Sequence, residues 1–429
     1  MKKRKEIFLE FLYYVFDSLL IPLVRSNFHV TESNVHRNRL FFFRHDVWRR
    51  MTEPALSHIK LSMFEEMDTM KVRKLLDARP LGFSQIRLLP KANGIRPIVN
   101  LRRRVTKLQK GKVVLGRSIN SIMAPVFSML DYEKRRNPSC IGSAIFSVGE
   151  IYPKLTAFQR QLRSNRPGSK IFYFAKCDVQ SCFDTIPQRG VVKLLEQVAS
   201  EDEYRIARHA EIKSSENHGY GVGTSPKPTR KFVALARAYT DFARFEGAVE
   251  TCYAKGKKNT VFVDAVVQTS QKRDKLLDLV EEHVERNIVK IGKKFFKQKA
   301  GIPQGSVLSS LLCNLFYAEL ERELLGFLKD DESILLRLID DFLLITTRKE
   351  HAERLLKIMH DGIEKYGVKV NPAKTLVTFE STFNGSRLPR LAKGTAFPYC
   401  GTRININTLE ITKDRDRRKD SCAAPASHS

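Results

Sequence analysis

The sequence predicts an α+β fold in which an antiparallel sheet, backed by helices, carries a cluster of carboxylates. The mostly apolar run 335–346 is interrupted by two adjacent acids, Asp340 and Asp341, and flanked by charges. That pattern is typical of two buried strands joined at a tight turn. A second apolar run, 171–178, ends on Asp178. Before both runs, residues 118–165 look mainly helical.

Two adjacent carboxylates in an apolar run need a compensating positive charge, because burial of an unpaired carboxylate is costly. We expect Asp178 to lie beside the turn formed by Asp340 and Asp341, so that three carboxylates surround one site. Two Mg²⁺ ions need such a ligand set to activate a 3′-hydroxyl and neutralise a leaving pyrophosphate. An ordinary Asp-Asp turn is the alternative. Asp184 is interpreted as a helix cap or an ion-pair partner.

The charge balance indicates a polyanionic partner. The chain has 75 Lys and Arg against 47 Asp and Glu, a net charge of +28, which favours nucleic acid before a membrane. Its 7 cysteines form no C-x-x-C pair, so neither a disulfide framework nor a zinc site is indicated. Acids interrupt the apolar N-terminus, where we expect an amphipathic helix in a soluble, intracellular protein without a membrane span.

Residues 1–60 are predicted to be helical and contain an aromatic cluster with three consecutive phenylalanines and the only Trp. These side chains suit stacking on bases and pairing with phosphates. They equally suit a hydrophobic staple between subdomains. The cluster comprises Phe41, Phe42, Phe43, Arg44 and Trp48.

Residues 86–100 predict a β-hairpin that turns at Asn93-Gly94. Its prolines mark an exposed edge. Lys91 and Arg96 make the hairpin a basic flap that can contact a triphosphate. Solvated surface charge is the alternative.

The segment 190–297 is long, mixed and charged, and is interpreted as an insertion in a core domain, with helical patterning at 233–246 and 275–288. After it, Gly301 and Gly305 permit close backbone approach, and Gln304 can bond a base or sugar edge. An ordinary loop-to-helix junction is the alternative.

Lys374 follows a Pro, where its ammonium can meet phosphates or protonate a leaving pyrophosphate, or simply be surface charge. Residues 397–401 precede a short strand, 403–406, expected to press on a primer backbone. From residue 413 the composition predicts disorder.

Together these segments resemble reverse transcriptases, and specifically the catalytic subunit of telomerase. Two features are typical of telomerase: residues 41–48 are similar to its T motif, and the insertion lies between motifs A and B′. The remaining similarities are motifs 1 and 2 at 87–100, motif A at 176–187, motif B′ at 301–306, motif C at 338–342, motif D at 370–379 and motif E at 397–401.

The resemblance implies a right-hand polymerase core with an antiparallel palm sheet, helical fingers and a largely absent thumb, as in a fragment or truncated isoform. The domains it implies are the end of the telomerase RNA-binding domain with the T motif at 1–60, the fingers hairpin and start of the palm at 61–190, the insertion in the fingers domain at 191–297, the palm at 298–408 and a truncated disordered tail at 409–429.

The resemblance also implies residue roles. Asp178, Asp340 and Asp341 would ligate two Mg²⁺ ions, and Lys374 would complete the catalytic set. Phe183 would stand against the sugar C2′ and exclude a 2′-hydroxyl. The nucleotide-binding residues would be Lys91, Arg96, Phe183, Gln304 and Gly305. The nucleic-acid-binding residues would be Phe41, Phe42, Phe43, Arg44, Trp48, Tyr399, Cys400 and Gly401.

The activity so implied is RNA-templated addition of deoxynucleotides to chromosome 3′ ends by a two-metal mechanism. Its partners would be a telomerase RNA template, a telomeric single-stranded DNA primer and dNTPs, without a membrane, in the nucleus at the telomeric region of chromosomes. The alternatives are a mobile-element reverse transcriptase and a non-catalytic truncated isoform that only binds RNA.

Overall fold

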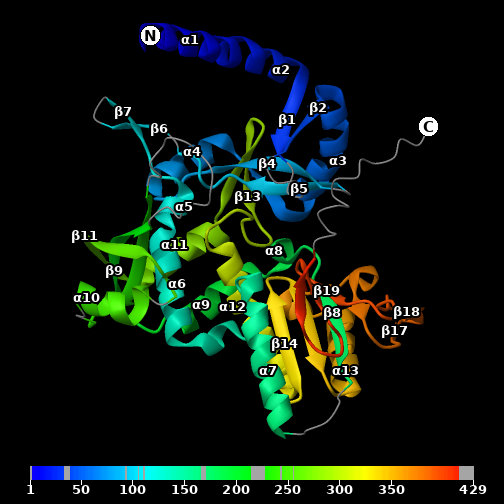
Figure 1. Cartoon of the computed structure of the whole chain (residues 1–429). Coiled ribbons are helices and arrows are strands. Elements are labelled where there is room, and N and C mark those ends of the chain that lie inside the picture. The colour runs from blue at the N-terminus through cyan, green and yellow to red at the C-terminus, as the bar shows by residue number, and fades with distance from the viewer. Residues whose placement is uncertain are drawn as a thin grey trace.

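The computed structural model describes residues 2–32, 39–91, 94–104, 106–109, 112–165, 171–213, 228–241, 244–254 and 256–414. A helical N-terminal arm leads into a region built on a mixed sheet, and a second region below it holds an antiparallel sheet between helices (Figure 1). The predicted disorder at 415–429 and the turn residue Asn93 lie outside the described residues.

The four-stranded palm sheet confirms the antiparallel sheet that the sequence predicts. Its order is β14-β15-β8-β16, and every pairing is antiparallel. The strands are β8 (Tyr173–Asp178), β14 (Ser333–Leu338), β15 (Asp341–Thr346) and β16 (Leu376–Val377).

Both faces of the palm sheet are covered, which explains why its strands are apolar at nearly every position. One face packs against α12 (Ser309–Leu324) and α13 (Lys349–Asp361). The other face packs against α7 (Ile151–Asn165) and a small sheet that begins with β19 (Phe397–Tyr399). That sheet continues through β20 (Thr402–Ile404) and β21 (Ile411–Lys413), so the expected disordered tail is wrong for residues 411–413.

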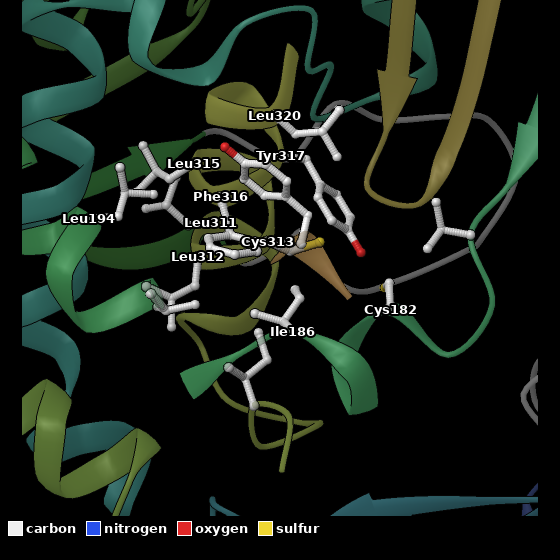
Figure 2. Packing of buried hydrophobic residues seen from close by; sticks show 14 of the residues in the cluster. Cys182, Ile186, Leu194, Leu311, Leu312, Cys313, Leu315, Phe316, Tyr317 and Leu320 are labelled. Atoms are coloured by element: carbon white, nitrogen blue, oxygen red, sulfur yellow. The ribbon is translucent and has the colours of Figure 1, made fainter. Parts of the chain in front are cut away.

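Helix α12 is apolar around its whole circumference because other elements enclose it. Every residue from Leu311 to Ala318 is buried, the pattern of a central core helix. Figure 2 shows its side chains meeting Ile186, beside α8 (Cys182–Thr185), and Leu194 of α9 (Gln188–Val198).

The predicted hairpin is β4 (Ser84–Lys91) and β5 (Gly94–Val99), with β5 at the edge of a five-stranded sheet. The other strands are β3 (Phe64–Met67) at the opposite edge, β13 (Lys294–Gln298) and β12 (Ile288–Ile291), in the order β3-β13-β12-β4-β5. The predicted hairpin is therefore confirmed, and it extends into a larger sheet.

The insertion carries a three-stranded antiparallel sheet, with β9 (Glu203–Lys213) between β10 (Thr229–Ala238) and β11 (Thr260–Lys272). Helix α11 (Arg273–Val284) confirms most of the second predicted helix. The first is wrong, because residues 233–238 pair with β9 along β10. Sheet pairing overrides the helix propensity of this alanine-rich segment.

Residues 1–60 are not wholly helical. After α1 (Lys2–Tyr13), a π-helical segment and α2 (Ile21–Asn27), the chain forms the hairpin β1 (Phe28–Glu32) and β2 (Leu40–Arg44). Helix α3 (His45–Met63) follows.

The helical arm bears on the expectation that the chain has no membrane span. Residues 3–27 form 25 residues of continuous helix, within which a window of 18 residues has a mean hydropathy of 1.8 and none of that window is buried. By length and composition alone it could cross a membrane, but a signal sequence or the core helix of a soluble protein has the same pattern.

The remaining elements complete the described part of the chain. The helices are α4 (Thr69–Ala78), α5 (Ile119–Ile122), α6 (Ala124–Arg136) and α10 (Phe245–Ala248), and the strands are β6 (Thr106–Gln109), β7 (Lys112–Leu115), β17 (Thr382–Phe383) and β18 (Ser386–Arg387). Short 3₁₀ turns lie at Pro138–Ile141, Val148–Glu150, Gly326–Leu328, Glu364–Tyr366 and Pro372–Lys374, and π-helical turns at Tyr14–Leu20 and Val249–Tyr253.

A buried ion pair joins the palm sheet to its central helix. Arg337 of β14 is 0% exposed, and its Nε donates to Oε1 of Glu321 on α12 over 2.6 Å. Its Nη1 donates to Oδ1 of Asn314 over 2.8 Å. The other Glu321 oxygen accepts from the backbone N of Ser143 at 2.7 Å. Because each charge meets an opposite charge or a hydrogen-bond partner, burial is tolerated here.

We expect Arg337→Ala to lower the free energy of unfolding by about 3–5 kcal/mol, because it leaves the Glu321 carboxylate buried without its cation. Denaturant unfolding measures this loss. The matched control is Lys294→Ala, which removes the exposed ion pair between Lys294 and Glu66 (2.6 Å) and is expected to cost about 1 kcal/mol or less. Equal losses for the two variants would contradict the anchoring role.

Candidate active site

The register of two strands brings the predicted acids together. Asp178, the last residue of β8, pairs directly with Asp341, the first residue of β15. Paired residues in an antiparallel ladder project to the same face. Asp340 lies next to this pair in the two-residue turn between Leu338 and Asp341. Acids more than 160 positions apart in the sequence thus share one end of the sheet.

The turn that presents Asp340 is strained. Ile339 has φ +60°, as the first central residue of a type II′ turn requires. A β-branched side chain is disfavoured there, at a cost of about 1–3 kcal/mol. The surrounding strands must therefore impose the tight bend.

Burial and crowding raise the pKa of Asp340. Desolvation is the main cause, the negative charges of Asp341 and Asp178 add to it, and the pKa is raised to about 6. The two neighbours each meet a lysine. Lys374 Nζ lies 2.8 Å from Oδ2 of Asp178, and Lys176 Nζ lies 3.5 Å from Oδ1 of Asp341. The hydrogen bond to Asp178 raises the pKa of Lys374.

A cavity of about 740 Å³ opens beside these acids. Its lining comes from the palm strands, the hairpin, α8 and the loop before α12, and includes Lys91, Arg96, Asp178, Phe183, Asp184, Gln304, Asp340 and Lys374. Burial and the charges of Arg96 and Lys374 lower the pKa of Lys91. Three cations converging on one hollow suit a polyphosphate.

Two glycines permit close contacts within this loop, as predicted. A Cβ on Gly301 (φ +68°) would lie 2.4 Å from the carbonyl oxygen of Phe183, and one on Gly305 (φ +109°) 2.5 Å from that of Val99. Backbone hydrogen bonds hold the loop at both contacts. Ile302 N donates to Phe183 O over 2.7 Å, and Val99 N donates to Gln304 O over 2.9 Å. Gly305 thus lies against the hairpin rather than lining the cavity.

The structure corrects the expected role of Tyr399. Its side chain is 1% exposed, and its hydroxyl donates to the backbone oxygen of Asp341 over 2.9 Å, so it supports the acid and is inaccessible to nucleic acid. Cys400 Sγ lies 3.6 Å from Oδ2 of the same residue. Gly401, with φ +81°, completes this turn.

Part of the aromatic cluster packs internally, and part of it is exposed. Trp48 stacks on His29 with ring centroids 4.2 Å apart, and Phe43 lies 5.1 Å from Trp48, so these rings staple α3 to the β1–β2 hairpin. Phe41 is half-buried, whereas Phe42 is 55% exposed and accessible to a partner. Arg44 is exposed and pairs with Asp46 at 3.2 Å.

Sequence reasoning missed Lys176 and gave Asp184 another role. Lys176 lies two positions before Asp178, so strand alternation could have placed it on the same face. Asp184 is not a helix cap, because the residue before α8 is Ser181. Its carboxylate instead accepts a hydrogen bond of 2.7 Å from Gln304 Nε2, a contact without a local sequence signal.

The donor chemistry fits a divalent cation, although the side chains have not converged. Among the described residues, no three His, Cys, Asp or Glu side chains stand close enough to hold a metal ion. Asp178 and Asp341 form ion pairs with lysines instead. Carboxylate oxygens are the ligands that Mg²⁺ prefers. Burial is the main cause of the raised pKa of Asp340 and the charges of Asp341 and Asp178 add to it, and a cation beside the three carboxylates would oppose both effects.

Comparisons with known proteins agree with this geometry. Residues 1–59 match the RNA-binding domain of the telomerase ribonucleoprotein complex, and residues 267–404 match the reverse transcriptase (RNA-dependent DNA polymerase) family. The second match contains Gln304, Asp340, Asp341 and Lys374 but not Asp178, which the fold brings to them.

The mouse telomerase reverse transcriptase is 30% identical over 96% of this chain, which spans 37% of that protein. Apo telomerase from Candida tropicalis matches with a TM-score of 0.66 and 19% identity, over 96% of this chain and 59% of that one. A Candida albicans telomerase in complex with a fragment of telomeric RNA gives a TM-score of 0.66 and 18% identity, over 94% and 56%. The predicted polymerase fold and the resemblance to telomerase reverse transcriptases are confirmed.

We expect Gly301→Ala to destabilise the protein more than Gly385→Ala. Both glycines have positive φ, but a Cβ on Gly385 (φ +75°) meets nothing within 4 Å. The backbone penalty of about 1–2 kcal/mol is therefore shared, and the clash at Gly301 adds about 1–3 kcal/mol. Denaturant unfolding of the two variants measures the difference, and equal free energies of unfolding would refute the close approach.

Proposed function

Because the chain is homologous to telomerase reverse transcriptases, we propose that it is the polymerising core of such an enzyme. It would add deoxynucleotides to DNA 3′ ends, copying an RNA template. The observation that carries this proposal is the pairing of Asp178 with Asp341 beside Asp340, at the edge of a cavity lined by Lys91, Arg96 and Lys374.

Reverse transcriptases generally use divalent metals, and we propose that Asp178, Asp340 and Asp341 hold two Mg²⁺ ions here. When bound, such ions lower the pKa of the attacking 3′-hydroxyl and neutralise charge on the phosphates. The fit rests on the carboxylate donors and on the raised pKa of Asp340.

The lining residues have complementary roles in this proposal. Lys91 and Arg96 hold the phosphates of the incoming nucleotide from the hairpin side, and Lys374 receives the leaving pyrophosphate. Phe183 presents its half-buried ring to the sugar, while Gln304 contacts the sugar or base. Gly305 contributes by letting the loop approach Val99.

The proposed partners are a telomerase RNA, a telomeric single-stranded DNA primer and dNTPs, in the nucleus at chromosome ends. The net charge of +28 and the match of residues 1–59 to an RNA-binding domain support the RNA. That match disfavours a mobile-element reverse transcriptase. The set of acids and cations around one cavity disfavours an isoform that only binds RNA.

We expect Asp178→Asn to lower the rate of primer extension on a supplied RNA–DNA hybrid by at least about a hundredfold, because it removes a metal-binding charge. Gel analysis of extension with and without Mg²⁺ measures it. Asp274→Asn, at an 85% exposed position on α11, is the matched control and is expected to extend like wild type. Extension by Asp178→Asn at the control rate would refute the proposed function.

We expect Phe183→Ala to admit ribonucleotides, because the ring would no longer exclude a 2′-hydroxyl. Single-nucleotide addition with dGTP and GTP gives the two kcat/KM values, whose ratio should fall by at least about tenfold in the variant. An unchanged ratio would place the sugar gate on another residue.

A further inference from the structure

The side chains of Asp184 and Gln304 meet inside the cavity from two different segments. Gln304 Nε2 donates to Oδ1 of Asp184 over 2.7 Å, and both residues line the 740 Å³ hollow. Asp184 belongs to α8, whereas Gln304 lies 120 positions later in the loop before α12. The sequence pattern does not indicate this contact.

The contact determines which end of the Gln304 amide faces the cavity. An ionised carboxylate only accepts hydrogen bonds, so the amide nitrogen must face Asp184. The carbonyl oxygen of the amide, and one remaining N–H, are then directed away from Asp184. The groups left for a nucleotide are this oxygen, an acceptor suited to a hydroxyl or an N–H of its sugar or base, and the one N–H donor.

The backbone around the pair is held as well. The carbonyl oxygen of Gln304 accepts from Val99 N over 2.9 Å, and Ile302 N donates to Phe183 O over 2.7 Å. These bonds fix the Cα of Gln304 between the hairpin and α8. These backbone bonds leave the side-chain torsions of Gln304 free, and the hydrogen bond to Asp184 fixes those torsions.

In this position the Asp184 carboxylate loses part of its hydration. Burial raises the pKa of its carboxyl, while the bond from Gln304 and the charges of Lys91 and Arg96 oppose the rise. Among the described residues, Asp184 makes no direct ion pair with either cation, and its carboxylate accepts its hydrogen bond from the amide of Gln304.

We propose that Asp184 is a positioning residue for the incoming nucleotide, acting through Gln304. It orients the Gln304 amide so that the carbonyl oxygen faces the nucleotide. This inference rests on the proposed polymerase function. Loss of the Asp184 carboxylate weakens nucleotide binding and leaves the acids at 178, 340 and 341 in place.

The test is single-nucleotide extension on a supplied RNA–DNA hybrid, with KM for the dNTP and kcat measured separately. We expect Asp184→Ala to raise KM by about tenfold, the effect of losing one hydrogen bond to a charged group. We expect kcat to change by less than about threefold. Asp184→Asn keeps an acceptor for the amide without the charge, and should return KM to within about threefold of wild type.

A double-mutant cycle separates positioning from a general structural role. If Asp184 acts through Gln304, then Asp184→Ala has no further effect on KM in a Gln304→Ala background. Thermal unfolding checks each variant, and Asp184→Leu replaces Asp184→Ala in the cycle if the latter is unfolded.

Additive effects in the cycle, or an Asp184→Asn variant as weak as Asp184→Ala, would overturn the inference. An unchanged KM in Asp184→Ala would also overturn it while leaving the polymerase assignment intact. Failure of that assignment gives a different result, since wild type would then not extend the primer or Asp178→Asn would extend it normally.

Discussion

The site depends on the register between β8 and β15. Strand alternation sends Ala175 and Cys177 into the core beneath α12 and α13, while Lys176 and Asp178 project to the opposite face. A slip of one residue would turn the Asp178 carboxylate and the Lys176 ammonium into the apolar core beneath α12 and α13, and both changes are costly. Because both faces of the sheet are covered, only one register keeps the side chains of β8 in their buried positions and places Asp178 at the end of the strand.

The buried Arg337 couples that register to the rest of the palm. It sits opposite Phe342 in the β14–β15 ladder and binds Glu321 on α12 at 2.6 Å. The loop at 301–308 leads directly into α12, and the same loop holds Gln304 against Asp184. The strand carrying the acids and the loop facing the cavity are thus fixed to a common helix.

The cavity combines opposite charges that come from different segments of the chain. Acids gather at the end of the sheet, and cations approach from the hairpin and from the turn at 372–374. The hydrogen bond between Lys374 and Asp178 joins the two groups, whereas burial lowers the pKa of Lys91 and raises that of Asp340. A metal-bound triphosphate would meet both groups with the complementary charge.

Local pattern was sufficient for the elements that carry the site. The apolar runs ending at Asp178 and broken at Asp340 predicted the palm strands, and Asn93-Gly94 predicted the hairpin, because alternation and turn chemistry act between near neighbours. Phe41, Phe43 and Trp48 illustrate the limit, since the sequence left stacking on bases and internal packing equally open.

Tertiary structure alone decided the rest. Residues 233–238 became a strand because β9 offered a partner, Tyr399 was buried because β19 packs under the palm sheet, and Asp184 met Gln304 across 120 positions of sequence. The sequence by itself determined which residues carry charge at strand ends and turns. Only the packing of distant segments decided which of those charges face one another, because contact energies depend on distances that local pattern does not encode.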